Sequence, residues 1–177
     1  MLRKILIALA LVVVGFIVVV ALQPSEFRIS RSATISAPPP QVFAQVNDFR
    51  KWQAWSPWAK LDPAAKAEFE GPPVGNGAVF RWAGNDQVGE GQMTLIESRQ
   101  SDLVRIKLDF VKPMAGTSFT EFTFRPQGDQ TAVTWVMSGR NDNFLAKAVC
   151  LFMNPDKMLG GTFEQGLANL KAVAEAR

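Results

Sequence analysis

The chain begins with an uninterrupted apolar run, and a regular alternation of apolar and polar positions starts only after it. Residues 5–22, ILIALALVVVGFIVVVAL, contain no charged or polar side chain. As a helix these eighteen residues extend about 27 Å, at ~1.5 Å each, which is close to the ~30 Å hydrocarbon core of a bilayer. We therefore expect residues 1–24 to form an N-terminal transmembrane anchor and residues 25–177 to form the folded domain.

A cleaved signal peptide is the alternative for this segment, because Val19 and Ala21 could occupy the minus-three and minus-one positions of a cleavage site. The apolar run exceeds the ~7 to 15 residues of a usual signal-peptide core, which favours the anchor. Arg3 and Lys4 precede the run and favour a cytoplasmic N-terminus. We thus expect a single-pass protein of the inner (cytoplasmic) membrane, with its domain on the periplasmic, extracytoplasmic side.

After the anchor, apolar residues at every second position predict a series of strands. The first covers residues 27–36, and others follow at 78–83, 88–98, 103–110, 117–126 and 131–139. The short polar turns between the later strands are typical of an antiparallel meander. Two sets of alternating residues should face the same interior: Val104, Ile106, Leu108 and Phe110, and Val133, Trp135 and Met137. The segment 61–76 is interpreted as a loop, because DPAAK and GPPVGNG are turn signals.

Other stretches have helical spacing of their apolar residues. A helix is predicted over 40–49, followed by a short helix in the tryptophan-rich stretch that Pro57 should stop. The C-terminal part returns to the helical period in the apolar piece 143–153 and in a long helix over 156–177. One stripe along the long helix consists of Phe163, Leu167, Leu170 and Ala174. This order predicts an α+β fold in which a curved antiparallel sheet wraps the long C-terminal helix.

The stretch FRKWQAWSPWAKLDP brings together three of the five tryptophans of the chain. Trp52 and Trp55 share a helix face, whereas Trp58 follows Pro57 and cannot continue that helix. A pair of aromatic side chains on one face of a short helix favours core packing. Contact with a ligand and a position in a membrane interface remain alternatives for these residues.

Charge and composition exclude several classes of function. The net charge of +3 includes Arg3 and Lys4, so the domain retains 3 − 2 = +1, and we expect no nucleic-acid partner. The chain has no histidine and one cysteine, Cys150, which we interpret as a small buried hydrophobe without an internal disulfide partner. With no histidine, no cysteine pair and no acidic cluster, we expect neither a metal site nor a cofactor.

Several of these stretches resemble one protein family. The segments RSATISAPPPQVFAQVNDFRKWQAWSPW, RWAGND, GEGQMTLIES, TAVTWVMSG and GTFEQGLANLKAVAE are similar to the START-related lipid-transfer and polyketide cyclase superfamily (SRPBCC), including its small bacterial members labelled polyketide cyclase or dehydrase. The resemblance covers about residues 27–176. It implies a helix-grip fold with a hydrophobic cavity between the sheet and the long helix, and it implies no fixed catalytic set.

The resemblance and the strand pattern together predict a site for a hydrophobic ligand. The residues expected to line it are Trp82, Met93, Phe110, Phe122, Phe124, Trp135, Met137 and Phe163. We therefore expect a membrane-anchored protein that binds a hydrophobic small molecule or lipid, and we favour this binding role over an enzymatic one. A polyketide cyclase or dehydrase-like enzyme and a protein-interaction module are the alternatives.

An enzyme would need an ionisable group in or near the cavity. Glu90, Asp109, Glu121 and Arg140 are the candidates. The alternation directs Asp109 and Glu121 away from the apolar face, so we expect solvent around them. Glu90 lies between two glycines that could form a bulge and turn its carboxylate inward, where burial would raise the carboxyl pKa and suit a general acid or base. No catalytic residue is assigned on this basis.

Overall fold

The computed structural model describes residues 1–140, 144–152 and 154–176. Its strands are β1 (Glu26–Ile35), β2 (Lys66–Glu70), β3 (Val79–Ala83), β4 (Glu90–Arg99), β5 (Leu103–Lys112), β6 (Gly116–Gln127) and β7 (Gln130–Arg140). Its helices are α1 (Leu2–Ala21), α2 (Pro39–Val46), α3 (Trp52–Trp55), α4 (Phe144–Phe152) and α5 (Pro155–Glu175), with 3-10 turns η1 (Phe49–Lys51) and η2 (Pro57–Lys60).

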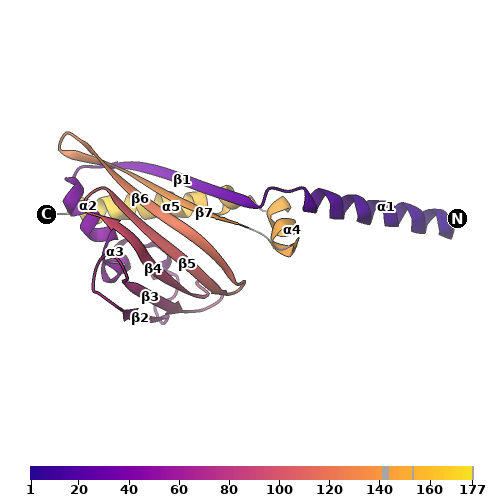
Figure 1. Ribbon diagram of the computed structural model, residues 1–177, viewed down its shortest axis with the longest axis horizontal. Coiled ribbons are helices and arrows are strands. Elements are labelled where there is room, and N and C mark those ends of the chain that lie inside the picture. The colour runs from indigo at the N-terminus through magenta and orange to yellow at the C-terminus, as the bar shows by residue number, and fades with distance from the viewer. Residues whose placement is uncertain (141–143, 153, 177) are drawn as a thin grey trace.

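The strands form one antiparallel sheet in the order β1-β7-β6-β5-β4-β3-β2. The long helix α5 runs along one face of this curved sheet, behind β1, β7 and β6 in Figure 1, while α1 projects away from the sheet. The main strand contact of α5 is with β1, and α2 and α3 lie beside it. The predicted α+β helix-grip fold is confirmed.

Strand pairing places the apolar residues of neighbouring strands on the concave face, under α5. Trp135 of β7 pairs with Phe122 of β6, and Phe122 in turn is next to Val104 of β5. The two sets of alternating residues on β5 and β7 therefore face the same interior, as the sequence predicts. The stripe Phe163, Leu167, Leu170 and Ala174 is buried against this face.

The interpretation of 61–76 as a loop is wrong for its central part, because β2 (Lys66–Glu70) pairs with β3 along its whole length. Every residue of β2 is exposed, and its sequence KAEFE is largely charged. An exposed edge strand buries neither face, so the apolar alternation that reveals a half-buried strand is weak there. Pairing with β3, the next strand along the chain, decides its conformation.

The tryptophan-rich stretch forms a single α-helical turn, α3, which is the predicted short helix. Pro57 ends that turn as predicted, and it also begins the 3-10 turn η2, where a missing N–H is tolerated. Trp52 and Trp55 are buried, and their indole N–H groups donate to the carbonyl oxygens of Val46 and Gln45. The core-packing interpretation of these two tryptophans is confirmed.

The C-terminal region contains two separate helices. Asn154 caps α5 by accepting a hydrogen bond from the backbone N–H of Asp156 at 2.9 Å. Pro155 follows as the first residue of α5, where proline is well tolerated. The prediction that Cys150 is a small buried hydrophobe concerns a side chain outside the described residues.

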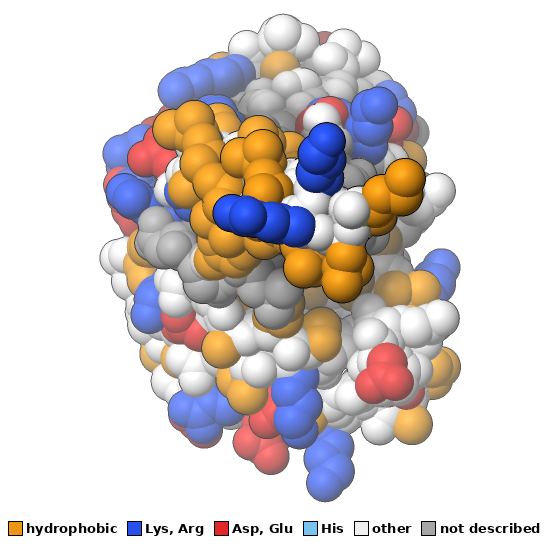
Figure 2. Space-filling view, turned by 90° about the vertical axis from the view of Figure 1, so that its right-hand side faces the viewer, with side chains coloured by type: hydrophobic (Ala, Val, Ile, Leu, Met, Phe, Trp, Pro, Cys, Tyr) orange, Lys and Arg blue, Asp and Glu red, His pale blue; other side chains and the backbone are white. Residues whose placement is uncertain are grey.

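Helix α1 is long enough and apolar enough to cross a membrane. Its mean hydropathy is 3.0, and only 6% of its apolar window is buried within the protein. A signal sequence near an N-terminus has the same length and composition. Figure 2 views the molecule from the side on which α1 projects, and hydrophobic side chains gather there.

Candidate functional site

The part of the concave face beneath α5 is a closed aromatic core. The ring of Trp135 stacks between Phe122 and Phe163, with centroid distances of 4.8 and 4.1 Å. Trp55 meets Trp135 edge-on at 5.8 Å. The indole N–H of Trp135 donates to the Thr120 hydroxyl at 2.7 Å, so the one polar atom of the ring is satisfied within the core.

A second part of the concave face is less covered. We define the open half as Phe80, Trp82, Leu108 and Phe110, which lie on β3 and β5 and are all half-buried. Trp82 and Phe110 meet edge-on at a centroid distance of 6.0 Å. Because α5 packs chiefly on β1, at the opposite edge of the sheet, these aromatic side chains keep accessible apolar surface.

Gly91 lies between Trp82 and Phe110 of the open half, since it pairs with both, and it explains how these two rings fit together. A Cβ atom at this position would lie 2.6 Å from the ring of Trp82 and 2.7 Å from the carbonyl oxygen of Asp109. Glycine therefore allows the indole to lie against β4, where its N–H donates to the Val88 carbonyl at 3.1 Å. The indole of Trp82 is held with one face against the sheet.

The residues predicted to line a ligand site all lie on or against the concave face, but in two different environments. Six of them are buried in the core: Met93, Phe122, Phe124, Trp135, Met137 and Phe163. Trp82 and Phe110 belong to the open half. The sequence does not distinguish these environments, because both kinds of position are apolar and alternate in the same way.

Ser118 is a polar group on the concave face that the sequence analysis missed. It pairs with Leu108 of the open half on one side and with Gly139 on the other. It is 6% exposed, so its hydroxyl lies within the largely apolar concave face. A Cβ atom on Gly139 would approach both this hydroxyl and the ring of Phe27 to 2.7 Å, so glycine there allows both side chains to pack against the backbone of β7.

Glu90 does not point into the interior. The predicted irregularity is present, because the β4–β5 register shifts between Glu90 and Gly91. The carboxylate nevertheless lies at the rim, where it pairs with Lys112 at 2.8 Å and its side chain is 37% exposed. The hydrogen bond that Lys112 donates to Glu90 raises the pKa of Lys112. The alternative in which the flanking glycines turn this carboxylate inward is therefore wrong, and no catalytic role is assigned to it.

The other ionisable candidates also lie outside the concave face. Asp109 accepts hydrogen bonds from Lys107 and Thr117; burial opposes ionisation, but these bonds hold the pKa of Asp109 below its ordinary value. Glu121 pairs with Arg105 at 2.7 Å on the convex face. Arg140 is exposed at the end of β7, 3.8 Å from Glu26.

Arg31 is the ionisable residue that does face the concave side, and it connects β1 to α5. Its guanidinium donates two hydrogen bonds to Asp156, at 2.8 and 3.1 Å, and one to Glu164 at 2.7 Å. A Cβ atom at Gly160 would collide with this guanidinium. The alternation predicts an inward position for Arg31, but its carboxylate partners lie more than a hundred residues away in sequence.

The Arg31–Asp156 pair predicts a loss of stability in acid. The hydrogen bond from Arg31 lowers the pKa of Asp156, so the pair contributes fully above the ordinary carboxyl pKa of about 4 and is lost as pH falls through the lowered value. Asp156→Asn should therefore lower the urea midpoint at pH 7 more than at pH 2.5. A difference between wild type and variant that is independent of pH would contradict this assignment.

Two surface hollows lie away from the concave face. One, of about 420 Å³, is on the convex face of the sheet between Arg28, Arg105 and Phe119. The other, of about 410 Å³, lies between α2 and the β4–β5 turn. Among the described residues, no group of three histidine, cysteine or acidic side chains could hold a metal ion.

Comparison with solved structures identifies the same fold in proteins of low sequence identity. Protein CV1439 from Chromobacterium violaceum is 18% identical, with a TM-score of 0.60, over 88% of this chain and 100% of its own. Mll3558 from Rhizobium loti is 18% identical with a TM-score of 0.62, over 85% and 98%. Aha1 from Colwellia psychrerythraea, solved as a dimer, is 16% identical with a TM-score of 0.56, over 84% and 96%.

These identities show a common fold and nothing more. No curated protein matches the chain significantly. A family model does match, and it covers all the strands and α5. The chain belongs to the family described as polyketide cyclase / dehydrase and lipid transport, whose model it matches over residues 26–175.

Proposed function

We propose that this protein is a membrane-anchored binding protein for a hydrophobic small molecule or lipid. The observation that carries the proposal is the open half, where Trp82 and Phe110 keep accessible apolar surface on strands that α5 leaves largely uncovered. The ligand would lie between this part of the sheet and the N-terminal part of α5. Apolar walls with a few polar groups are what a site for a small apolar molecule needs.

Ser118 supplies the polar contact in this proposal. A hydroxyl can both donate and accept a hydrogen bond, so it suits an uncharged oxygen such as that of an alcohol, ester or acid group. Burial of apolar ligand surface would supply most of the affinity, at about 25 cal/mol per Å². With α1 spanning the bilayer, the site meets membrane-dissolved ligands at a high effective concentration.

The family description keeps an enzyme of the cyclase or dehydrase type as a second candidate. General acid or base catalysis needs an ionisable group near the reacting atoms. Within the described residues, Arg31 is the ionisable side chain on the concave face, and two carboxylates already occupy its guanidinium. This arrangement favours binding. Loss of a measured turnover by Glu90→Gln alone would instead favour the enzyme.

Removal of the Phe110 ring should weaken ligand binding. A buried phenylalanine side chain contributes about 2 kcal/mol, so Phe110→Ala should raise the dissociation constant of an apolar fluorescent probe by roughly 30-fold. The measurement is a titration of residues 25–177 with 1-N-phenylnaphthylamine. Native mass spectrometry of the same preparation would identify a ligand retained from the cell.

Phe119→Ala is the matched control, because Phe119 is a phenylalanine of β6 that is 43% exposed on the convex face. It should leave the probe affinity unchanged. Equal losses in both variants would place the probe elsewhere. An unchanged affinity in Phe110→Ala would refute the location of the site in the open half.

A further inference from the structure

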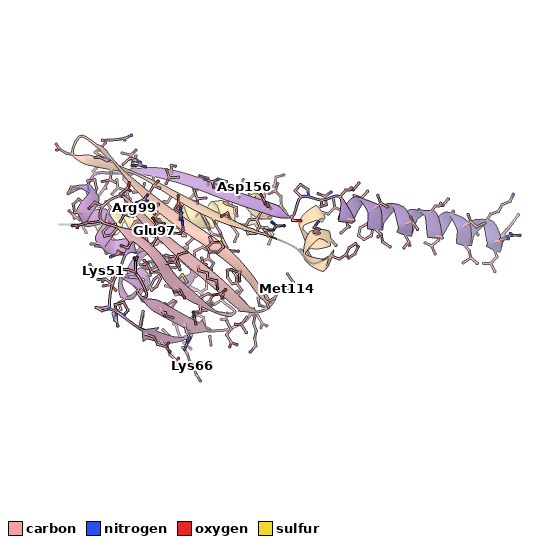
Figure 3. All side chains as sticks on the ribbon, viewed as in Figure 1. Lys51, Lys66, Glu97, Arg99, Met114 and Asp156 are labelled. Carbon is pink, nitrogen blue, oxygen red and sulfur yellow. The ribbon has the colours of Figure 1, made fainter. Side chains whose placement is uncertain are left out.

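The end of the sheet nearest to α1 carries apolar side chains that the domain leaves about half exposed. At the β5–β6 turn, Val111 and Met114 are 54% and 49% exposed. Large apolar side chains at the tip of a hairpin contribute nothing to the core, and they are a liability in water unless another surface covers them. Figure 3 shows Met114 at the tip of this hairpin, directed to the side of the molecule from which α1 extends.

Strand pairing places the β5–β6 hairpin at the end of the sheet that adjoins α1. Phe110 pairs with Gly116 at the base of the turn, and Ser118 pairs with Gly139 near the end of β7. The end of β7 pairs in turn with Glu26, the first residue of β1. Only residues 22–25 separate β1 from α1. The hairpin tip and the C-terminal end of α1 therefore lie at the same end of the sheet (Figure 1).

Helix α4 adds a second apolar surface at this end. It packs against α1, and the Lys147 ammonium donates to the carbonyl oxygen of Ala21 at 3.4 Å. Phe144 and Val149 of α4 are exposed, as is Met158 in the first turns of α5. An apolar helix with a lysine beside the end of a membrane span is typical of a segment that lies in a membrane interface.

We propose that the β5–β6 hairpin tip and α4 form a docking surface for the bilayer that holds α1. This inference rests on the proposed membrane span of α1, and it adds the orientation of the domain. The four-residue connection keeps this end of the sheet close to the membrane surface, so the bilayer is the apolar phase within reach of Val111 and Met114. Lys112 at the tip is 72% exposed and can reach lipid phosphates.

The docking surface would place the ligand site next to the lipids. Phe110 and Trp82 of the open half lie at the ends of β5 and β3, on the same side of the sheet as the hairpin tip. A domain docked by Met114 and α4 would therefore direct the open half toward the membrane. An apolar ligand could then pass between bilayer and protein with little exposure to water.

The test is depth-dependent quenching of a fluorophore on the full-length chain in phosphatidylcholine and phosphatidylglycerol liposomes. Cys150, the only cysteine, is replaced by serine, and an environment-sensitive NBD label is attached to Met114→Cys. Gln127→Cys, in the β6–β7 hairpin at the opposite end of the sheet, is the control for a label on a hairpin that is surrounded by water. Val12→Cys, within α1, is the control for a label inside the bilayer.

We expect the label at position 114 to shift its emission to the blue and to be quenched by lipids that carry a shallow doxyl group. The label at position 127 should remain unquenched. Quenching at position 12 but not at 114 would overturn the docking surface and leave the anchor intact. Absence of quenching at both positions would overturn the anchor and the docking surface together. Protection of position 114 from iodide without quenching by doxyl lipids would indicate a protein neighbour, and would also overturn the proposal.

Discussion

Replacement of Trp135 by alanine should lower the free energy of unfolding by about 4 kcal/mol, because it removes a complete indole ring from the packed interior. Trp135 is 2% exposed and lies between the rings of Phe122 and Phe163. The variant would lose these contacts, leave a cavity that the surrounding strands cannot close, and deprive the Thr120 hydroxyl of its donor. Urea unfolding followed by circular dichroism would measure this loss.

Two further variants make the Trp135 experiment specific. Trp135→Phe keeps an aromatic ring but loses the indole N–H, so its cost should be smaller, about 1 to 2 kcal/mol. Phe119→Ala, on the convex face, should change the stability by less than about 0.5 kcal/mol. If Trp135→Ala unfolded at nearly the wild-type urea concentration, the region beneath α5 would be a tolerant cavity and not a packed core.

Replacement of Gly166 by alanine should be destabilising by about 2 to 3 kcal/mol, even though alanine is the better helix former by ~1 kcal/mol. A Cβ atom at this position would lie 2.7 Å from the ring of Trp135 and 3.2 Å from Pro57. The rings of Phe122 and Phe163 both stack on Trp135, so the indole cannot move away easily. Either α5 must shift away from the sheet or the aromatic stack must rearrange.

Gly161 provides a matched control on the same helix. It is exposed, and a Cβ atom there would have no neighbour within 4 Å. Gly161→Ala should therefore stabilise the protein by roughly 0.5 to 1 kcal/mol, through helix propensity alone. Opposite changes in the thermal midpoint of the two variants would support close packing of α5 on Trp135. A stabilising Gly166→Ala would show that α5 lies farther from the sheet.

The sequence predicted those elements whose own pattern of apolar residues records their burial. It missed the features that depend on contact with another segment of the chain. The strands β4 to β7 and the stripe on α5 were predicted because each buries one face, and the period of apolar residues records that burial locally. Strand β2 was missed because it buries neither face and depends on pairing with β3. The pairing of Arg31 with Asp156 was missed because the two residues approach only in the folded chain.

The candidate site was likewise predicted only in part from the sequence. The sequence predicts which residues face the concave side, since alternation decides the side of a strand, and all the residues predicted to line the ligand site lie on or against that face. It does not distinguish the closed core around Trp135 from the open half around Trp82, because the two have the same composition. For Glu90, the flanking glycines correctly indicated an irregularity in the strand. The position of its carboxylate depends on Lys112 of the neighbouring strand, which holds it at the rim.

The sequence by itself determined the apolar N-terminal helix, the succession of helices and half-buried strands, and the family to which the chain belongs. Each of these depends on local periodicity or on motifs that lie together in the chain. The tertiary structure alone decided that α5 covers one edge of the sheet, that aromatic rings fill the interior beneath it, and that the open half lies at the same end as α1. Those features depend on the fit between side chains from distant elements, and their volumes and positions come together only when the sheet curves around the helix.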